Sequence, residues 1–238
     1  MWNYSLPLKS VAARSLVSAF AIAIALAAAS SSAAIYTEVG DAGQTQGTAQ
    51  NTTAGGQAFQ PLTDILGSLP NESDVDLYLI RITNPGSFSA TTLFNTTVFD
   101  TQLFLLTLAG GPVYTNDDDP GGLTTLSTLP SGNVFGPVAP GLYLLGISMS
   151  FNDPVNSINQ LLFAGGLSTD VRGPATGLVP PILGGYTNGA FADFGTYDIR
   201  LTGASSVPEP ASSALLIVAA IGAFATSRRR RQASTAAA

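Results

Sequence analysis

The chain has 238 residues, no cysteine, no histidine and a formal net charge of −6 at pH 7, and its only lysine is Lys9. These absences exclude disulfides, zinc sites built from His and Cys, cysteine nucleophiles, histidine-based triads and Ser-Lys dyads. Aspartate and glutamate carboxylates are therefore the groups left for catalysis or metal binding.

Residues 1–34 have the pattern of a secretory signal peptide. Lys9 and Arg14 give a positively charged beginning, and residues 16–29 form an apolar stretch rich in alanine. Small residues at 32–34 then form a cleavage site, and we predict the cut after Ala34. A retained transmembrane helix is the alternative, and the small-residue ending argues against it.

The segment after the cut is acidic. Residues 35–206 contain three arginines and fourteen acidic residues, a formal charge near −11. Nucleic acid is therefore not an expected partner, because phosphate binding needs a basic face. The length suits one domain with a sizeable core. Residues 35–60 lack a sustained hydrophobic period, so we predict that residues 35–72 form a flexible arm with one edge strand, followed by a β domain at 73–206.

Alternating apolar residues predict the first strands of that domain. Residues 74–82 (DVDLYLIRI) and 87–94 (SFSATTLF) alternate with period two, and Asn84, Pro85 and Gly86 between them form a turn signal. We predict that the two segments pair as a hairpin. Residues 99–108 are almost continuously apolar, which is typical of a strand buried on both faces.

Further strands are predicted at residues 112–115, 123–129, 141–150 and 195–203. Residues 151–194 are rich in Gly and Pro, so they are either a functional insertion or a stretch of short strands that the pattern does not reveal. No amphipathic helix is evident between the two ends. The expected fold is all-β, a β-sandwich or jelly roll.

Seven polar residues near predicted strand ends are the candidate metal ligands. Calcium takes about 6 to 8 oxygen ligands from carboxylates, amides and carbonyls, and an aspartate-rich turn beside strand ends supplies them. The alternative is that Asn, Asp, Pro and Gly at residues 116–122 serve only as turn formers. The predicted calcium ligands are Asp74, Asp76, Asp100, Asn116, Asp117, Asp118 and Asp119.

The end of the chain has three parts in order. Pro208, Glu209 and Pro210 come first, an uncharged apolar run follows at residues 211–226, and four arginines close it: Arg228, Arg229, Arg230 and Arg231. The prolines predict an extended, accessible triplet. The apolar run is just under the ~17 to 25 residues of a membrane-spanning helix, and the arginines would stay on the cytoplasmic side. A plain C-terminal anchor is the alternative.

Together these three parts resemble the PEP-CTERM sorting signal, here at residues 207–231, with a disordered tail at 232–238. The resemblance implies that an exosortase, a membrane peptidase, recognises the tail at the inner membrane. It also implies delivery to the cell surface or to an exopolysaccharide matrix, as in biofilm-forming bacteria. A plain anchor does not account for the triplet.

The predicted strands carry a second resemblance. DVDLY at 74–78, DTQLFLL at 100–106, NDDDPGG at 116–122 and GLYLLGIS at 141–148 occur in the order of bacterial pre-peptidase C-terminal domains. That resemblance implies a secreted β-sandwich module that aids adhesion or substrate binding. The long stretch at 151–194 departs from the family's shorter pattern, which leaves the sheet order open.

Three functions are compatible with this sequence. The first is a non-catalytic surface or matrix protein. The second is a carbohydrate-binding module with sugars stacked on Tyr143, Tyr186, Phe191, Phe194 or Tyr197. The third is a glycosidase that uses two carboxylates, for which Glu38 and Glu72 are the only glutamates before the tail. We expect the first, with no catalytic residues.

Overall fold

The structure is a computed structural model that describes residues 33–53, 59–93, 96–189 and 193–207. The chain divides into two compact units, Met1–Ser30 and Ser31–Ala238, and every described residue belongs to the second. The predicted sorting tail from Pro208 onward and the predicted signal peptide, apart from Ala33 and Ala34, lie outside the described residues. None of the described residues belongs to a helix with the length and hydropathy of a membrane span.

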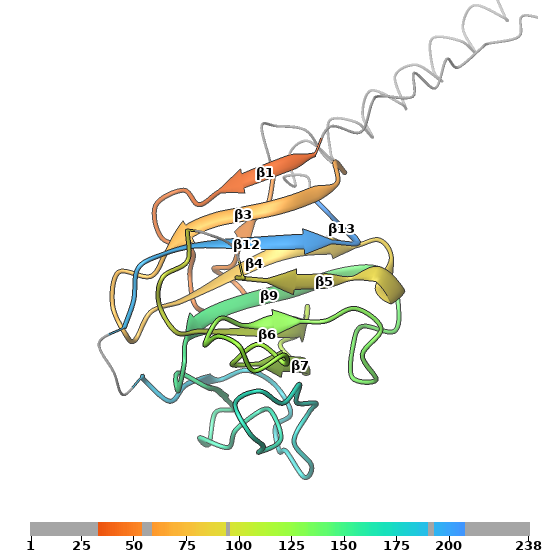
Figure 1. Cartoon of the computed structure of the whole chain (residues 1–238). Coiled ribbons are helices and arrows are strands. Elements are labelled where there is room, and N and C mark those ends of the chain that lie inside the picture. The colour runs from red at the N-terminus through yellow and green to blue at the C-terminus, as the bar shows by residue number, and fades with distance from the viewer. Residues whose placement is uncertain (1–32, 54–58, 94–95, 190–192, 208–238) are drawn as a thin grey trace, which may run out of the picture. The chain divides into compact units, whose positions relative to one another are not determined.

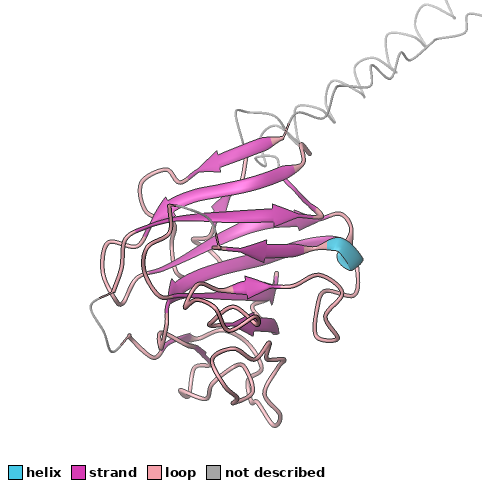
Figure 2. Cartoon of the chain, viewed as in Figure 1, coloured by secondary structure: helices cyan, strands magenta, loops and turns pink. Residues whose placement is uncertain are grey.

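The described part of the chain is all-β, as predicted, with about 39% strand and almost no helix. Its single helical element is a 3-10 turn, η2 (Pro85–Ser87). The strands form mixed sheets (Figure 2). This composition follows from the sequence, in which β-branched and aromatic residues alternate with polar ones between Gly- and Pro-rich turns.

The first sheet has five strands in the order β1-β3-β12-β5-β8. Strand β1 runs parallel to β3, and the other neighbours are antiparallel. The sheet is visible across the front of Figure 1. Its strands are β1 (Ala34–Thr37), β3 (Leu62–Ser68), β12 (Thr196–Thr202), β5 (Ser89–Thr91) and β8 (Thr128–Leu129).

The second sheet has the order β13-β4-β9-β6-β7, with β2 added in parallel to β4. A separate ribbon pairs β10 (Pro154–Val155) with β11 (Gly185–Tyr186). The strands of the second sheet are β13 (Ala204–Ser205), β4 (Val75–Ile82), β9 (Gly141–Met149), β6 (Thr101–Thr107), β7 (Pro112–Asn116) and β2 (Gln50–Asn51).

The two sheets share one hydrophobic core. Ile65 and Ile199 of the first sheet join Tyr78, Leu105 and Leu145 of the second in one buried cluster. Alternate residues of each strand reach this core because strand side chains point to opposite faces in turn. The burial of this apolar area supplies the main stabilising term.

The outer face of the second sheet is covered as well. Phe104 and Leu144 on that face pack with Leu162, Phe163 and Leu183 of the long segment 151–194. This explains the continuous apolar run at 99–108, since β6 is buried on both faces, as predicted. The segment also contains β10 and β11, so part of it consists of short strands that the pattern did not reveal.

The predicted hairpin between residues 74–82 and 87–94 is wrong. Strand β4 lies in the second sheet between β9 and β13, whereas β5 lies in the first sheet between β12 and β8. The Asn84-Pro85-Gly86 turn contributes to η2, which carries the chain from one sheet to the other. Period-two alternation specifies a half-buried strand but not its partner, because either sheet can cover the apolar face.

The expected arm at 35–72 also differs from the structure. Strand β1 is an edge strand, as predicted, but β3 at 62–68 is an interior strand between β1 and β12. The boundary at 72/73 therefore does not coincide with the fold, which already includes Ala34. The predicted strand at 123–129 is reduced to the two residues of β8.

Candidate functional site

The structure places four of the seven predicted calcium ligands in two separate acidic clusters. Asp100, Asp117 and Asp118 form one, which we call the strand-end cluster, and one carboxylate oxygen of each lies within 4.8 Å of the others. Asp76 joins Glu38 and Asp41 in the second, the arm cluster, with the same mutual spacing. Each cluster offers the carboxylate oxygens that calcium prefers.

Strand pairing brings the strand-end cluster together. Asp100 directly precedes β6 and Asp117 follows β7, and these strands are antiparallel neighbours, so the two residues meet at one edge. Ser150 follows β9 on the other side of β6. Its amide donates to the Asp100 carbonyl at 3.1 Å, and its hydroxyl donates to Asp117 Oδ2 at 3.1 Å.

Two carboxylates of this cluster each have a buried oxygen without a hydrogen-bond partner among the described residues, which is energetically unfavourable for the charged form. Asp117 is 8% exposed, and among the described residues its Oδ1 has no hydrogen-bond partner, nor has Oδ1 of Asp100. Burial raises the pKa of Asp117 to about 6, opposed by the Ser150 hydrogen bond and by Arg172. Burial and the neighbouring charges of Asp117 and Asp118 raise the pKa of Asp100 to about 7.

Further oxygens surround this cluster. Asp118 Oδ2 accepts from Ser168 Oγ at 2.5 Å, and Asp193 Oδ2 accepts from the Asp100 amide at 2.9 Å. A divalent cation here would lower the free energy of the buried carboxylates by giving them an opposite charge and the missing partner. The set of hard oxygen donors suits calcium rather than a soft metal.

Two of the predicted ligands have structural roles instead. Asn116 is fully buried, and its Oδ1 accepts from the Thr128 amide at 2.8 Å while its Nδ2 donates to the Asp170 carbonyl at 3.3 Å. Asp119 Oδ2 accepts from the Gly121 amide at 3.0 Å and so closes the turn. For these two residues the turn-forming interpretation describes what the structure shows.

The arm cluster contains two residues that the sequence analysis did not assign to a metal. Glu38 and Asp41 follow β1 in a turn at Gly40, whose φ of +72° favours glycine. Asp76 reaches them from β4 and is fully buried. A pair of acids three residues apart around a glycine was the available signal, and the weak hydrophobic pattern around it hid its importance.

Asp74 lies beside the arm cluster. It is 3% exposed, its Oδ1 accepts from Gln44 Nε2 at 3.1 Å, and its Oδ2 lacks a partner within the described ranges. Burial, together with the charge of Asp41, raises its pKa. This end of the domain therefore concentrates negative charge from the arm and from β4.

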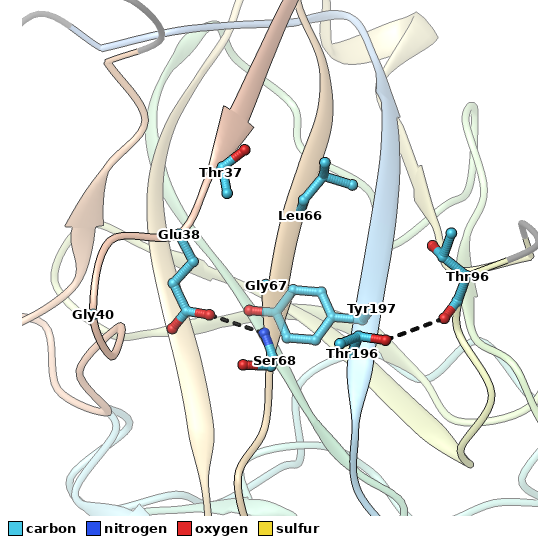
Figure 3. A pocket seen from close by; sticks show the side chains of 9 residues that line it. All are labelled: Thr37, Glu38, Gly40, Leu66, Gly67, Ser68, Thr96, Thr196 and Tyr197. Atoms are coloured by element: carbon cyan, nitrogen blue, oxygen red, sulfur yellow. Dashed lines mark hydrogen bonds between the residues drawn. The ribbon is translucent and has the colours of Figure 1, made fainter.

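A depression of about 440 Å³ opens next to the arm cluster (Figure 3). Glu38 and Gly40 lie on one side of it, and Thr96 and Thr196 lie on the other. Tyr197 also lines it, although that side chain is only 2% exposed. Of the three cluster residues, Glu38 lines this depression.

The four predicted sugar-stacking aromatics that the structure describes lie in different environments. Tyr197 belongs to the core, and Tyr186 packs against Phe104 while its hydroxyl donates to the Gln44 carbonyl at 3.0 Å. Tyr143 is half-buried, Phe194 is 43% exposed, and Phe191 lies outside the described residues. Of these, Tyr143 lines a second depression, of about 250 Å³, together with Phe135.

No family model matches the chain, and no curated protein matches it either. The resemblances to the PEP-CTERM signal and to pre-peptidase C-terminal domains therefore stay predictions. The function has to be argued from the residues and from the geometry described above.

Proposed function

We propose that the chain is an exported, non-catalytic protein of the cell surface or extracellular matrix, sorted by an exosortase and associated with exopolysaccharide. Its working part is the β domain, a β-sandwich or jelly roll similar to pre-peptidase C-terminal domains. The observation that carries the proposal is the sequence at 208–231, where a Pro-Glu-Pro triplet, an apolar run and an arginine cluster follow one another.

Each part of the tail has a physical role in this proposal. The triplet gives the peptidase an extended segment, since prolines fix φ and lack an amide donor. The apolar run inserts into the inner membrane, and the arginines keep its end on the cytoplasmic side. The last described strand, β13, ends at Ser205, so the triplet follows this strand after two residues.

Calcium at the strand-end cluster fits an exported protein of this kind. The chain has no cysteine and hence no disulfide to stabilise it outside the cell. A cation that binds the folded state, and not the unfolded chain, adds stability that grows with its free concentration. The Oδ1 atoms of Asp100 and Asp117, which have no partner within the part of the chain that the structure describes, support this assignment.

The test of sorting is the location of the full chain in cells that carry the exosortase. We expect the wild-type protein to be processed near the triplet and to reach the surface. The variant Pro208→Ala/Glu209→Ala/Pro210→Ala should remain uncut in the inner membrane. The variant Pro208→Glu/Glu209→Pro keeps the composition of the triplet and changes its order, so it should also remain uncut. Surface delivery of the alanine variant would refute the proposal.

Carbohydrate binding is the second candidate, and the depression of about 250 Å³ favours it. Phe135 is 44% exposed beside Tyr143, with prolines 112, 137 and 174 around them. The ring of Phe135 lies against Gly173, where a Cβ would collide with it. An apolar depression with few polar groups is typical of a binding surface for small ligands.

Binding of the chain to purified exopolysaccharide tests this candidate. Phe135→Ala should lower the binding at least tenfold, and Phe59→Ala, which removes a similarly exposed aromatic outside the depression, should leave it unchanged. Release of reducing ends would instead support the glycosidase interpretation. Unchanged binding by Phe135→Ala would exclude this depression as the sugar site.

A further inference from the structure

We propose that Glu38, Asp41 and Asp76 form a second calcium site, which fastens the N-terminal arm to both sheets. In the structure, the part of the predicted arm that precedes β3 is residues 34–53, from β1 to just beyond β2, and we use the word arm for these residues from here on. The inference is independent of the sorting signal and of the strand-end cluster.

The first observation is the convergence of three carboxylates from distant parts of the chain. One oxygen each of Glu38, Asp41 and Asp76 lies within 4.8 Å of the other two. Calcium binds oxygens at about 2.3 to 2.6 Å, so oxygens on opposite sides of an ion are about 5 Å apart. The spacing therefore leaves room for one ion between the three groups.

The second observation is the unpartnered oxygen of Asp76. This side chain is 0% exposed, and its Oδ1 has no hydrogen-bond partner among the residues that the structure describes. Its Oδ2 accepts from the hydroxyl of Tyr197 at 2.5 Å, so the carboxylate is held in one orientation. A buried carboxyl oxygen without a partner is costly unless a ligand supplies the missing interaction.

The charges around Asp76 do not compensate it. Among the described residues, the charged groups that act on Asp76 are Glu38, Asp74 and Asp41, and all three are acidic. Like charges in one buried place destabilise the folded state unless protons or a cation neutralise them. A divalent cation would compensate two of these charges at once.

The turn after β1 presents Glu38 in a fixed position. Its Oε1 accepts from the Ala42 amide at 2.8 Å. Its Oε2 accepts from the Ser68 amide at 2.9 Å, and Figure 3 shows this second bond. Each carboxylate oxygen keeps a further lone pair for a metal. The positive φ of Gly40 allows the chain to turn so that Asp41 follows on the same side.

The position of the cluster in the fold explains what the ion would do. Strand β1 pairs with β3 in the first sheet, and β2 pairs with β4 in the second. Glu38 and Asp41 lie in the stretch that crosses between these two strands, and Asp76 lies on β4 itself. An ion held by all three therefore links the crossing stretch of the arm to the second sheet, while Glu38 remains bonded to β3 through Ser68.

The cluster is open to solvent on one side. Glu38 and Gly40 line the depression in Figure 3, and Asp41 is exposed. The site is thus buried at Asp76 and open at Asp41. This arrangement permits exchange with calcium in the surrounding medium without unfolding of the domain.

The test is the number of calcium ions bound by the full chain, measured by native mass spectrometry and by calorimetric titration after divalent cations have been removed. We expect two ions for the wild type and one for Asp41→Asn, whose substituted side chain is exposed and leaves the core intact. Asp117→Asn should keep the arm-cluster ion and lose the strand-end ion. Asp119→Asn makes the same change of charge outside both clusters and should keep both ions.

Amide exchange supplies a second readout that is specific to the arm. Calcium should slow exchange of the Ala42 amide at least tenfold in the wild type and in Asp117→Asn, but not in Asp41→Asn. If Asp41→Asn binds as many ions as the wild type and shows the same protection of Ala42, the site does not exist. If Asp117→Asn retains both ions while Asp41→Asn loses one, the strand-end assignment fails and the arm site stands.

Discussion

Asp117→Asn should make the calcium-free protein more stable at neutral pH, although it changes a buried polar residue. The pKa of Asp117 is raised to about 6 by burial, from 3.8 in the unfolded chain. A raised pKa means that the folded state binds the proton more tightly, so stability is present below 3.8 and is lost as the pH rises through 6. The asparagine has no proton to lose and avoids this loss.

The size of the effect follows from the shift. A difference of about 2 pKa units corresponds to about 3 kcal/mol at pH 7.5, of which roughly half is already present at pH 5. Ser150 Oγ can still donate to the asparagine carbonyl, and the substitution removes one negative charge from beside Asp100 and Asp118. We therefore expect a gain of about 1 to 3 kcal/mol at pH 7.5.

Calcium should reverse this order. The wild type gains about 4.1 kcal/mol when free calcium is 1,000 times the Kd, which exceeds the advantage of the variant, whereas Asp117→Asn lacks the ligand and does not gain it at this cluster. Urea unfolding at pH 5 and pH 7.5, with and without calcium, measures the difference in stability between wild type and variant under each of these four conditions. A variant less stable than the wild type at pH 7.5 without calcium, with no reversal on adding it, would refute the reasoning.

Three further substitutions test the packing, a buried hydrogen bond and an ion pair. Gly146→Ala places a Cβ against the buried ring of Phe104 and should lower stability by about 2 kcal/mol, or Tm by about 4 to 8 °C. The control Gly165→Ala, where a Cβ meets nothing within 4 Å, should leave Tm unchanged, and equal melting of the two variants would contradict the packing. Tyr197→Phe removes the hydroxyl between Tyr78 and Asp76 and should lose about 1 to 3 kcal/mol in urea unfolding, a result that an unchanged midpoint would exclude. Asp64→Asn breaks the exposed ion pair with Arg200 (3.3 Å) and should lower the free energy of unfolding by less than about 1 kcal/mol, as for an ordinary surface pair. A larger loss would contradict this interpretation of the pair.

The sequence predicted the strands whose burial alternates or is continuous. Strands β4 and β12 follow from period-two patterns, and β6 follows from an apolar run that needs cover on both faces. Strand β9 was also predicted, at residues 141–150. Strand β3 was missed because LTDILGS carries Asp64 and Gly67 among its apolar residues. Gly67 is needed there because the hydroxyl of Tyr197 occupies the place of a Cβ.

Strand partners were harder to predict than strands. The pattern at residues 87–94 fits a hairpin with β4 as well as a strand of the opposite sheet, because both bury the same alternate residues. Only the packing of η2 and the pairing of β5 with β12 decide between them. Local turn chemistry at Pro85 and Gly86 does not contain that information.

The acidic clusters show the same limit. Asp100, Asp117 and Asp118 were identifiable because they adjoin recognisable strand ends. Glu38 and Asp41 became relevant only once β1 and β2 had anchored the arm beside Asp76, a contact across more than thirty residues of sequence. Spacing in the sequence cannot reveal such a cluster, because the sheet pairing creates it.

The intact mass of the chain recovered from the cell surface tests the central claim of export and sorting most directly. The account predicts a polypeptide that begins at Ile35 and ends near the Pro208–Pro210 triplet. Recovery of the protein only from the cytosol, at its full mass of 24.3 kDa, would contradict it.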